Sequence, residues 1–262
     1  MITFAAIVPH PPMLLPKVGK DNVKKAKVTV AAMKTIEQDL YLSHPDTIVV
    51  VSPHGPVMPD AFMINLAANY SAGFKDFGDF ETVKTWTADF MLIDRIQRNA
   101  RKETPLVLGS EENLDYGAGI PLVLLTEHLP KVTVIPVVTS GLDLKAHYDF
   151  GKLLKDELMA SNKRVAVVAS ADLSHTLTKD APAGFAKEGA ELDKTIQDLL
   201  TTKNAAGLIG TDTKLREAAH ECGLRPILTL LGTLDGVNYD PKIISYEFPF
   251  GVGYLVSNLV LS

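Results

Sequence analysis

Three short apolar runs, each followed at once by polar residues, constrain the fold of this chain more than any other feature. Residues 3–8, 47–52 and 165–169 are each short enough to form a strand that is buried on both faces. His10, His54 and His175 follow the three runs within a few positions. Ligands of open α/β sheets bind beyond the carboxyl ends of the parallel strands. The pattern therefore predicts that the three histidines share one site, and we expect a metal ion there.

The segments between these runs predict alternating helices and strands. Residues 21–42 carry apolar side chains at helical spacing, so the first two runs and this helix form a right-handed βαβ unit. Further strands are expected over 61–68, 132–138, 243–248 and 253–260. Further helices are expected over 87–100, 145–160, 190–200, 212–221 and 226–234, and residues 114–125 predict a Gly-rich turn followed by a helix that starts at Pro121. Residues 69–81 show no apolar period, and we predict a long loop there. No repeat or linker interrupts this alternation, which favours one α/β domain.

The composition is that of an ordinary globular protein and excludes several classes of partner. The 262 residues are 46% hydrophobic and 22% charged, and the net charge is −5 with scattered Lys and Arg, so we expect no nucleic-acid partner and no membrane partner. A single cysteine, Cys222, excludes an internal disulfide framework and fits a reducing compartment. Neither a basic secretory leader nor a transmembrane-length apolar stretch is visible, so we expect a cytoplasmic protein.

Histidines at strand ends suggest a specific kind of metal chemistry. A lone histidine in such a place is more often packed or hydrogen-bonded than a ligand, but three at corresponding positions weaken that interpretation. Two neutral imidazoles and one carboxylate, with open coordination positions, form the facial triad of non-haem Fe(II) oxygenases. A third imidazole is then free to transfer protons, because imidazole titrates near neutral pH.

Several motifs in a fixed order resemble one enzyme superfamily. They are PHPP around His10, SPHG around His54, ASADLSH ending at His175, GFAKEGAELD, and ECGLRP beginning at Glu221. Together they resemble the class III extradiol ring-cleavage dioxygenases, of which the catalytic subunit of protocatechuate 4,5-dioxygenase is the best-known member. The similarity is closest to the dioxygenase-like domain of AmmeMemoRadiSam system proteins and extends from Ile7 to the closing PFGVGY.

The resemblance implies a fold and a cofactor. We expect a single three-layer α/β/α domain over residues 1–262, with a central mostly parallel sheet and the active site at the C-terminal ends of the strands. A mononuclear Fe(II) ion would lie in the crevice. His10 and His54 match the two histidine ligands of the family, and Glu221 takes the place of its carboxylate ligand.

Two other residues are alternative candidates for the third metal ligand. In the related Memo proteins a cysteine stands at the position of Cys222, and a thiolate suits a softer or redox-active metal. Glu247, before the final turn, is a weaker carboxylate candidate. Such a ligand set also suits Zn(II), so purified protein could carry zinc.

The resemblance also assigns catalytic roles. His175 matches the acid–base that moves a proton between a chelated catechol-type substrate and bound oxygen. Asp172 could orient His175 or a metal-bound water, or it could simply cap the turn after the strand. In the family motif Asp-His-Gly, a tyrosine replaces the histidine here (Asp115-Tyr116-Gly117), and a phenol with a pKa of about 10 is a poor base at neutral pH.

Three functions fit these residues. The first is a non-haem Fe(II)-dependent extradiol-type dioxygenase that opens the ring of a small catechol-like aromatic substrate with O2. The second, favoured by Tyr116 and Cys222, is a Memo-like metal-binding or adaptor protein without dioxygenase activity, working with an AmmeMemoRadiSam-type partner. The third is a zinc hydrolase on the same scaffold. A homodimer is expected only by analogy with the family.

Overall fold

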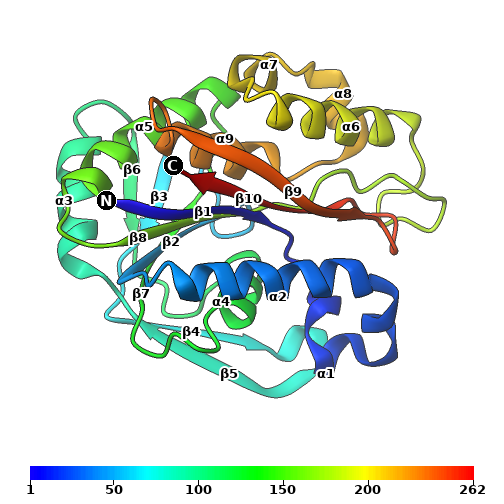
Figure 1. Cartoon of the computed structure of the whole chain (residues 1–262), viewed down its shortest axis with the longest axis horizontal. Helices are drawn as coiled ribbons and strands as arrows, with labels where there is room; N and C mark the ends of the chain where they lie inside the picture. The colour runs from blue at the N-terminus through cyan, green and yellow to red at the C-terminus, as the bar shows by residue number, and fades with distance from the viewer.

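An eight-stranded sheet runs through the middle of the molecule and separates two layers (Figure 1). The computed structural model describes all residues from Met1 to Ser262. The strand order is β6-β3-β7-β2-β8-β1-β10-β9. Its strands are β1 (Ile2–Val8), β2 (Thr47–Ser52), β3 (Phe62–Asn65), β6 (Leu106–Gly109), β7 (Thr133–Val138), β8 (Val165–Ser170), β9 (Tyr239–Glu247) and β10 (Tyr254–Leu261).

The four central strands, β7, β2, β8 and β1, are parallel neighbours. Antiparallel pairs lie at both flanks, where β3 pairs with β7 and β10 pairs with β1. Every residue of β2 and β8 is buried, which is why both strands read as continuous apolar runs rather than as alternating ones. The expected α/β fold with a mostly parallel central sheet is confirmed.

Six helices cover one face of the sheet. They are α3 (Phe90–Ala100), α5 (Leu144–Ala160), α6 (Lys187–Thr201), α7 (Ala205–Ile209), α8 (Thr213–Ala219) and α9 (Leu224–Thr233). Their buried side chains form one apolar cluster with alternate strand residues such as Val49 and Val51. No helix in the chain combines the length and the apolar character that crossing a bilayer requires.

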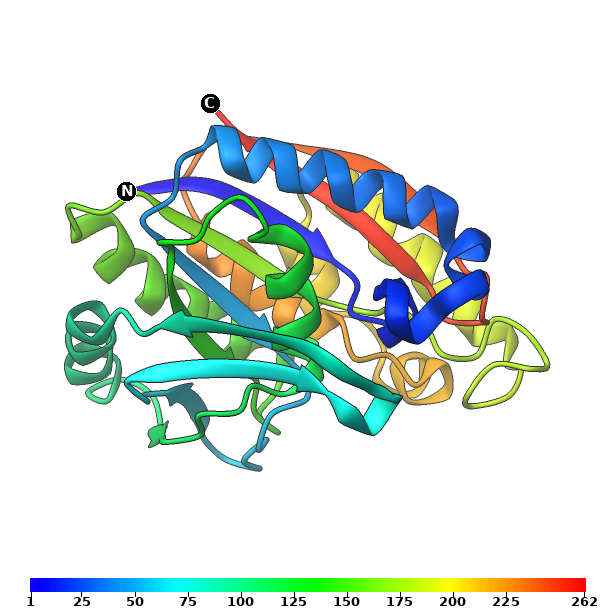
Figure 2. The same cartoon turned by 90° about the horizontal axis from the view of Figure 1, so that it is seen from below.

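The opposite face is covered by two helices and a hairpin (Figure 2). The helices are α2 (Lys27–Leu42) and α4 (Tyr116–Leu125), and the hairpin joins β4 (Asn69–Phe74) to β5 (Asp79–Thr87). They pack with Ile48 and Val50 of β2 in the second apolar cluster. Short helical turns fill the loops: η1 (Pro12–Leu14), α1 (Pro16–Gly19), η2 (Lys20–Ala26) and η3 (Lys75–Phe77).

The loop predicted over residues 69–81 was wrong, because this segment begins the hairpin. Every second residue of β4 (Tyr70, Ala72 and Phe74) packs into the second cluster, which is the period of a strand with one buried face. Gly and Asp residues, which suggested an irregular loop, are gathered at the turn, where Gly78 has a φ of +83°. The helix predicted from residue 21 begins as the 3-10 segment η2, and α2 itself starts at Lys27.

The topology brings three polar strand ends to one edge of the sheet. Strand β8 lies between β2 and β1, with Val51 opposite Ala169 and Val8 opposite Ser170. The residues that follow these three strands therefore lie next to one another at the same edge of the sheet. This edge carries the side chains described next.

Candidate metal centre

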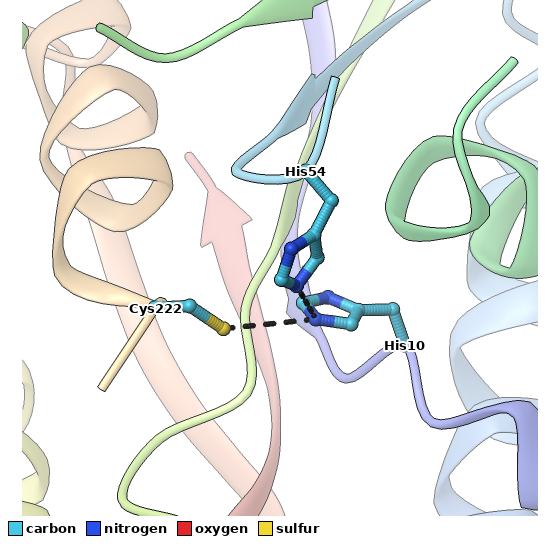
Figure 3. A group of neighbouring side chains, drawn as sticks. All are labelled: His10, His54 and Cys222. Carbon is cyan, nitrogen blue, oxygen red and sulfur yellow. Dashed lines mark hydrogen bonds between the residues drawn. The ribbon is translucent and has the colours of Figure 1, made fainter. Parts of the chain in front are cut away.

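Three metal-ligating side chains converge at this edge (Figure 3). His10 follows β1, His54 follows β2, and Cys222 lies in the turn between α8 and α9. One ligand atom from each lies within 4.8 Å of the others. The two Nε2 atoms are 2.9 Å apart, and Sγ of Cys222 is 3.7 Å from Nε2 of His10. Two nitrogens bound at right angles to one ion lie about 3 Å apart, so the imidazoles fit a shared cation.

A hydrogen-bond chain fixes the tautomer of His10. Pro121 lies inside α4 and has no N–H group, so it leaves the carbonyl oxygen of Gly117 without its usual helical donor. The hydroxyl of Ser170 donates to that carbonyl oxygen. Its proton is then engaged, and it accepts the proton on Nδ1 of His10 at 2.8 Å. The lone pair of His10 is therefore on Nε2, the nitrogen that faces His54 and Cys222.

His54 is held by packing against the start of α4. Its ring stacks on Tyr116, with centroids 4.5 Å apart and planes 23° from parallel. A Cβ on Gly117 would lie 2.6 Å from Oγ of Ser52 and 3.1 Å from the His54 ring, so only glycine permits this approach. Asp115, the N-cap of α4, accepts the Ser52 hydroxyl at 2.5 Å. These contacts connect the second imidazole to the same helix that orients the first.

Burial keeps both imidazoles neutral. Burial and, to a smaller extent, the nearby charge of His175 lower the pKa of His10 to about 3. Burial and, to a smaller extent, the charge of His10 lower the pKa of His54 to about 4. A neutral imidazole is the form that binds a metal. Both rings are thus in the ligating state over the whole physiological pH range.

Cys222 is protonated in the metal-free protein. Burial raises the pKa of its thiol well above the ordinary value, and the charges of Asp172 and Glu221 raise it further. The Sγ–H group donates to the carbonyl oxygen of Asp172 at 3.4 Å. A thiolate is the form that ligates metals, so binding of a cation by Cys222 must release this proton.

The structure places the two candidate carboxylates elsewhere. Glu221 accepts the backbone N–H of Leu224, the first residue of α9, at 2.8 Å. Glu247 accepts the backbone N–H and the hydroxyl of Thr29 at 2.6 and 2.7 Å, which joins β9 to α2. Neither belongs to the converging group, whose third donor is Cys222.

The three predicted catalytic residues surround this group. Asp172 is 5% exposed, and its Oδ1 accepts the backbone N–H of His10 at 2.9 Å. Burial raises the pKa of this carboxyl to about 7. The His175 ring is close enough for its charge to lower the pKa of both other histidines, and its Nδ1 is buried without a hydrogen-bond partner. Burial raises the pKa of Tyr116 to about 12, so it remains a phenol.

No role for Ser170, Gly117 or Pro121 in holding His10 was expected from the sequence. The helix predicted to start at Pro121 begins at Tyr116 instead, so the proline lies inside α4 and exposes the carbonyl oxygen four residues earlier. Which side chain reaches that oxygen depends on the packing of α4 against the sheet. Sequence periodicity does not contain this information.

Comparisons with known proteins agree with this architecture. The family model described as the catalytic LigB subunit of aromatic ring-opening dioxygenase matches residues 4–257. Protein CA_C1420 of Clostridium acetobutylicum is 30% identical over 97% of this chain, which spans only 56% of that longer protein. The crystal structure of the uncharacterized protein JW3007 from Escherichia coli K12 superposes with a TM-score of 0.70. It covers 98% of this chain and 99% of its own at 15% identity, which is a likeness of fold.

Ser170→Ala should weaken metal binding without unfolding the protein. The variant leaves Nδ1 of His10 without its acceptor, and loss of such a supporting partner typically lowers metal affinity by about 10- to 100-fold. Competition with a chromophoric chelator measures the affinity for Zn(II). Ser245→Ala, which removes a buried hydroxyl without a partner on β9, is the control and should bind as tightly as the wild type. Equal affinities for all three proteins would contradict the role assigned to Ser170.

The pH dependence of metal binding should identify the third ligand. The imidazoles have pKa values of about 3 and 4 and lose no proton on binding above pH 5, whereas the thiol of Cys222 loses one. Affinity should therefore rise with pH, and Cys222→Ser should reduce the slope of log affinity by about one between pH 5 and 7. Co(II)-loaded wild type should also show a thiolate charge-transfer band that this variant lacks. Identical slopes and spectra would exclude the thiol as a ligand.

Proposed function

Because the chain belongs to the family of catalytic LigB subunits of aromatic ring-opening dioxygenases, we propose that it is a mononuclear Fe(II) enzyme of the extradiol type. Its substrates would be a small catechol-like aromatic and O2. The convergence of His10, His54 and Cys222 beside His175, at the carboxyl edge of the parallel strands, carries this proposal. His10, His54 and Cys222 would hold the ion. When bound, Fe(II) supplies open coordination positions and the redox chemistry that joins a diol to O2.

The proton transfers are assigned to His175. Its Nδ1 is buried without a partner, which leaves Nε2 as the nitrogen that can exchange a proton with a ligand in the crevice. There the ring accepts a proton from a substrate hydroxyl and returns it as the ring opens. No other histidine in the group is available for this task, because the tautomer of His10 is fixed by Ser170 and the pKa of His54 is about 4.

Asp172 and Tyr116 have supporting roles in this proposal. Asp172 holds the backbone of His10 and, with a pKa of about 7, changes charge close to working pH. Tyr116 remains a phenol, so it can donate a hydrogen bond to an oxygen of the substrate but cannot act as a base. Its stacking on His54 also makes it a wall of the crevice.

A second function, metal binding without ring cleavage, is favoured by two observations. The third donor of the group is a thiol rather than a carboxylate, and Tyr116 stands where a second base would be needed. In this role the chain would be a Memo-like metal-binding or adaptor protein that works with an AmmeMemoRadiSam-type partner. The same donor set suits Zn(II). A stably bound partner protein, together with no oxygen uptake by iron-loaded protein, would favour this function over the first.

His175→Gln should keep the metal and lose turnover. Glutamine can hydrogen-bond but cannot take up a proton, and general acid–base catalysis typically contributes about 10²- to 10⁴-fold. Oxygen uptake by anaerobically Fe(II)-loaded protein with catechols, gallate and aminophenols measures activity, and metal analysis measures retention. His128→Gln, an exposed histidine that pairs with Glu37, is the control and should remain active.

Two outcomes would contradict this proposal. Loss of iron in His175→Gln would make His175 a ligand rather than the acid–base. Absence of oxygen uptake over the whole panel, with iron bound to the wild type, would argue against ring cleavage and for the second function.

A further inference from the structure

A pocket of about 490 Å³ lies next to the converging group and shares His54 with it. It extends from His54 and Gly55, at the end of β2, over Met63 and Val138 of β3 and β7. The segment that leads into α4 forms its other wall. Pockets that bind small ligands typically have volumes of about 300–1,000 Å³, so this one can hold a single substituted ring. We call it the β3–β7 pocket.

The charged side chains that line this pocket are all acidic. Glu111 and Asp115 line it, whereas no lysine or arginine does. One oxygen of Asp115, Oδ1, accepts the Ser52 hydroxyl and the N–H of Ala118. The other oxygen has no hydrogen-bond partner and faces Gly55, whose added Cβ would lie 3.3 Å from it. A carboxylate oxygen is therefore free to accept a hydrogen bond from a ligand.

Glu111 is exposed, but its position is fixed. The buried side chain of Asn65 accepts the backbone N–H of Glu111 at 2.8 Å and donates to the carbonyl oxygen of the same residue. This pair of bonds fastens the segment to β3. The carboxylate of Glu111 itself forms no ion pair, so its charge at the pocket is not neutralised by a neighbouring side chain.

Arg216 and Arg225 do not line the pocket and so do not balance these charges there. Arg216 and Arg225 lower the pKa of Glu221 and belong to α8 and α9, which cover the opposite face of the sheet. A ligand with a carboxylate would therefore meet like charge in the β3–β7 pocket, whereas an ammonium group would meet two carboxylates. Like-charge contacts of this kind determine which ligands a site rejects.

We propose that the β3–β7 pocket binds the ammonium group of an aromatic amine. This inference deepens the proposed function, because it specifies that the ring substrate carries a cationic rather than an anionic side chain. His54 connects the two sites, since its ring belongs both to the converging group and to the wall of the pocket. The ring of the substrate would lie next to His54, and its amine next to Glu111 and Asp115.

Two phenols of equal length and opposite charge test the pocket in metal-free protein. Tyramine ends in an ammonium and 3-(4-hydroxyphenyl)propionate in a carboxylate, and neither has a diol that could chelate a metal. Calorimetry should show tighter binding of tyramine, by about tenfold, as expected for partly screened charges a few ångströms apart. Glu111→Gln should weaken tyramine binding by about three- to tenfold.

Glu112→Gln is the matched control, since it removes the same charge from the adjacent exposed residue, which does not line the pocket. It should bind tyramine as the wild type does. Equal affinity for the two phenols, tighter binding of the carboxylate, or equal effects of the two variants would each overturn the proposal. Because these titrations involve neither metal nor O2, failure of ring cleavage leaves their result unaffected, and the two proposals can fail separately.

Discussion

The contact between the Ser170 hydroxyl and Nδ1 of His10, at 2.8 Å, is the interaction on which the centre depends. It joins the ends of two neighbouring parallel strands, β8 and β1. The hydroxyl can accept only because its own proton is given to the carbonyl oxygen of Gly117, which a proline has left free. The proline inside α4 thereby determines which ring nitrogen of His10 carries the proton. This arrangement is rigid, because each member is buried and hydrogen-bonded.

Burial keeps most of the titratable groups at this edge of the sheet neutral. Two imidazoles with pKa values of about 3 and 4 and a thiol with a raised pKa carry no charge at neutral pH, whereas a carboxyl with a pKa of about 7 is partly ionised. A divalent cation would change this balance, because it favours loss of protons from the thiol and the carboxyl. Uptake of a metal ion would therefore be coupled to proton release.

The fold and the chemistry of this molecule depend on different sets of residues. The likeness to JW3007 covers 98% of this chain at 15% identity, which shows how far side chains can change while the fold is kept. Function is decided by the few residues at the carboxyl edge. In this chain a thiol and a phenol occupy positions next to the two imidazoles, and acidic residues line the adjacent pocket. These features, rather than the sheet, distinguish what the chain can bind.

The sequence by itself determined the central strands and the edge at which they end. Continuous apolar runs are buried on both faces, and parallel strands must end together, so His10 and His54 were expected to meet. The hairpin of β4 and β5 escaped prediction because glycines and aspartates at its turn obscured a short alternation. Only the tertiary structure showed that Cys222, rather than Glu221, lies next to the two imidazoles. Glu221 instead accepts the N–H of Leu224 at the start of α9, because the first N–H groups of a helix have no partner within it.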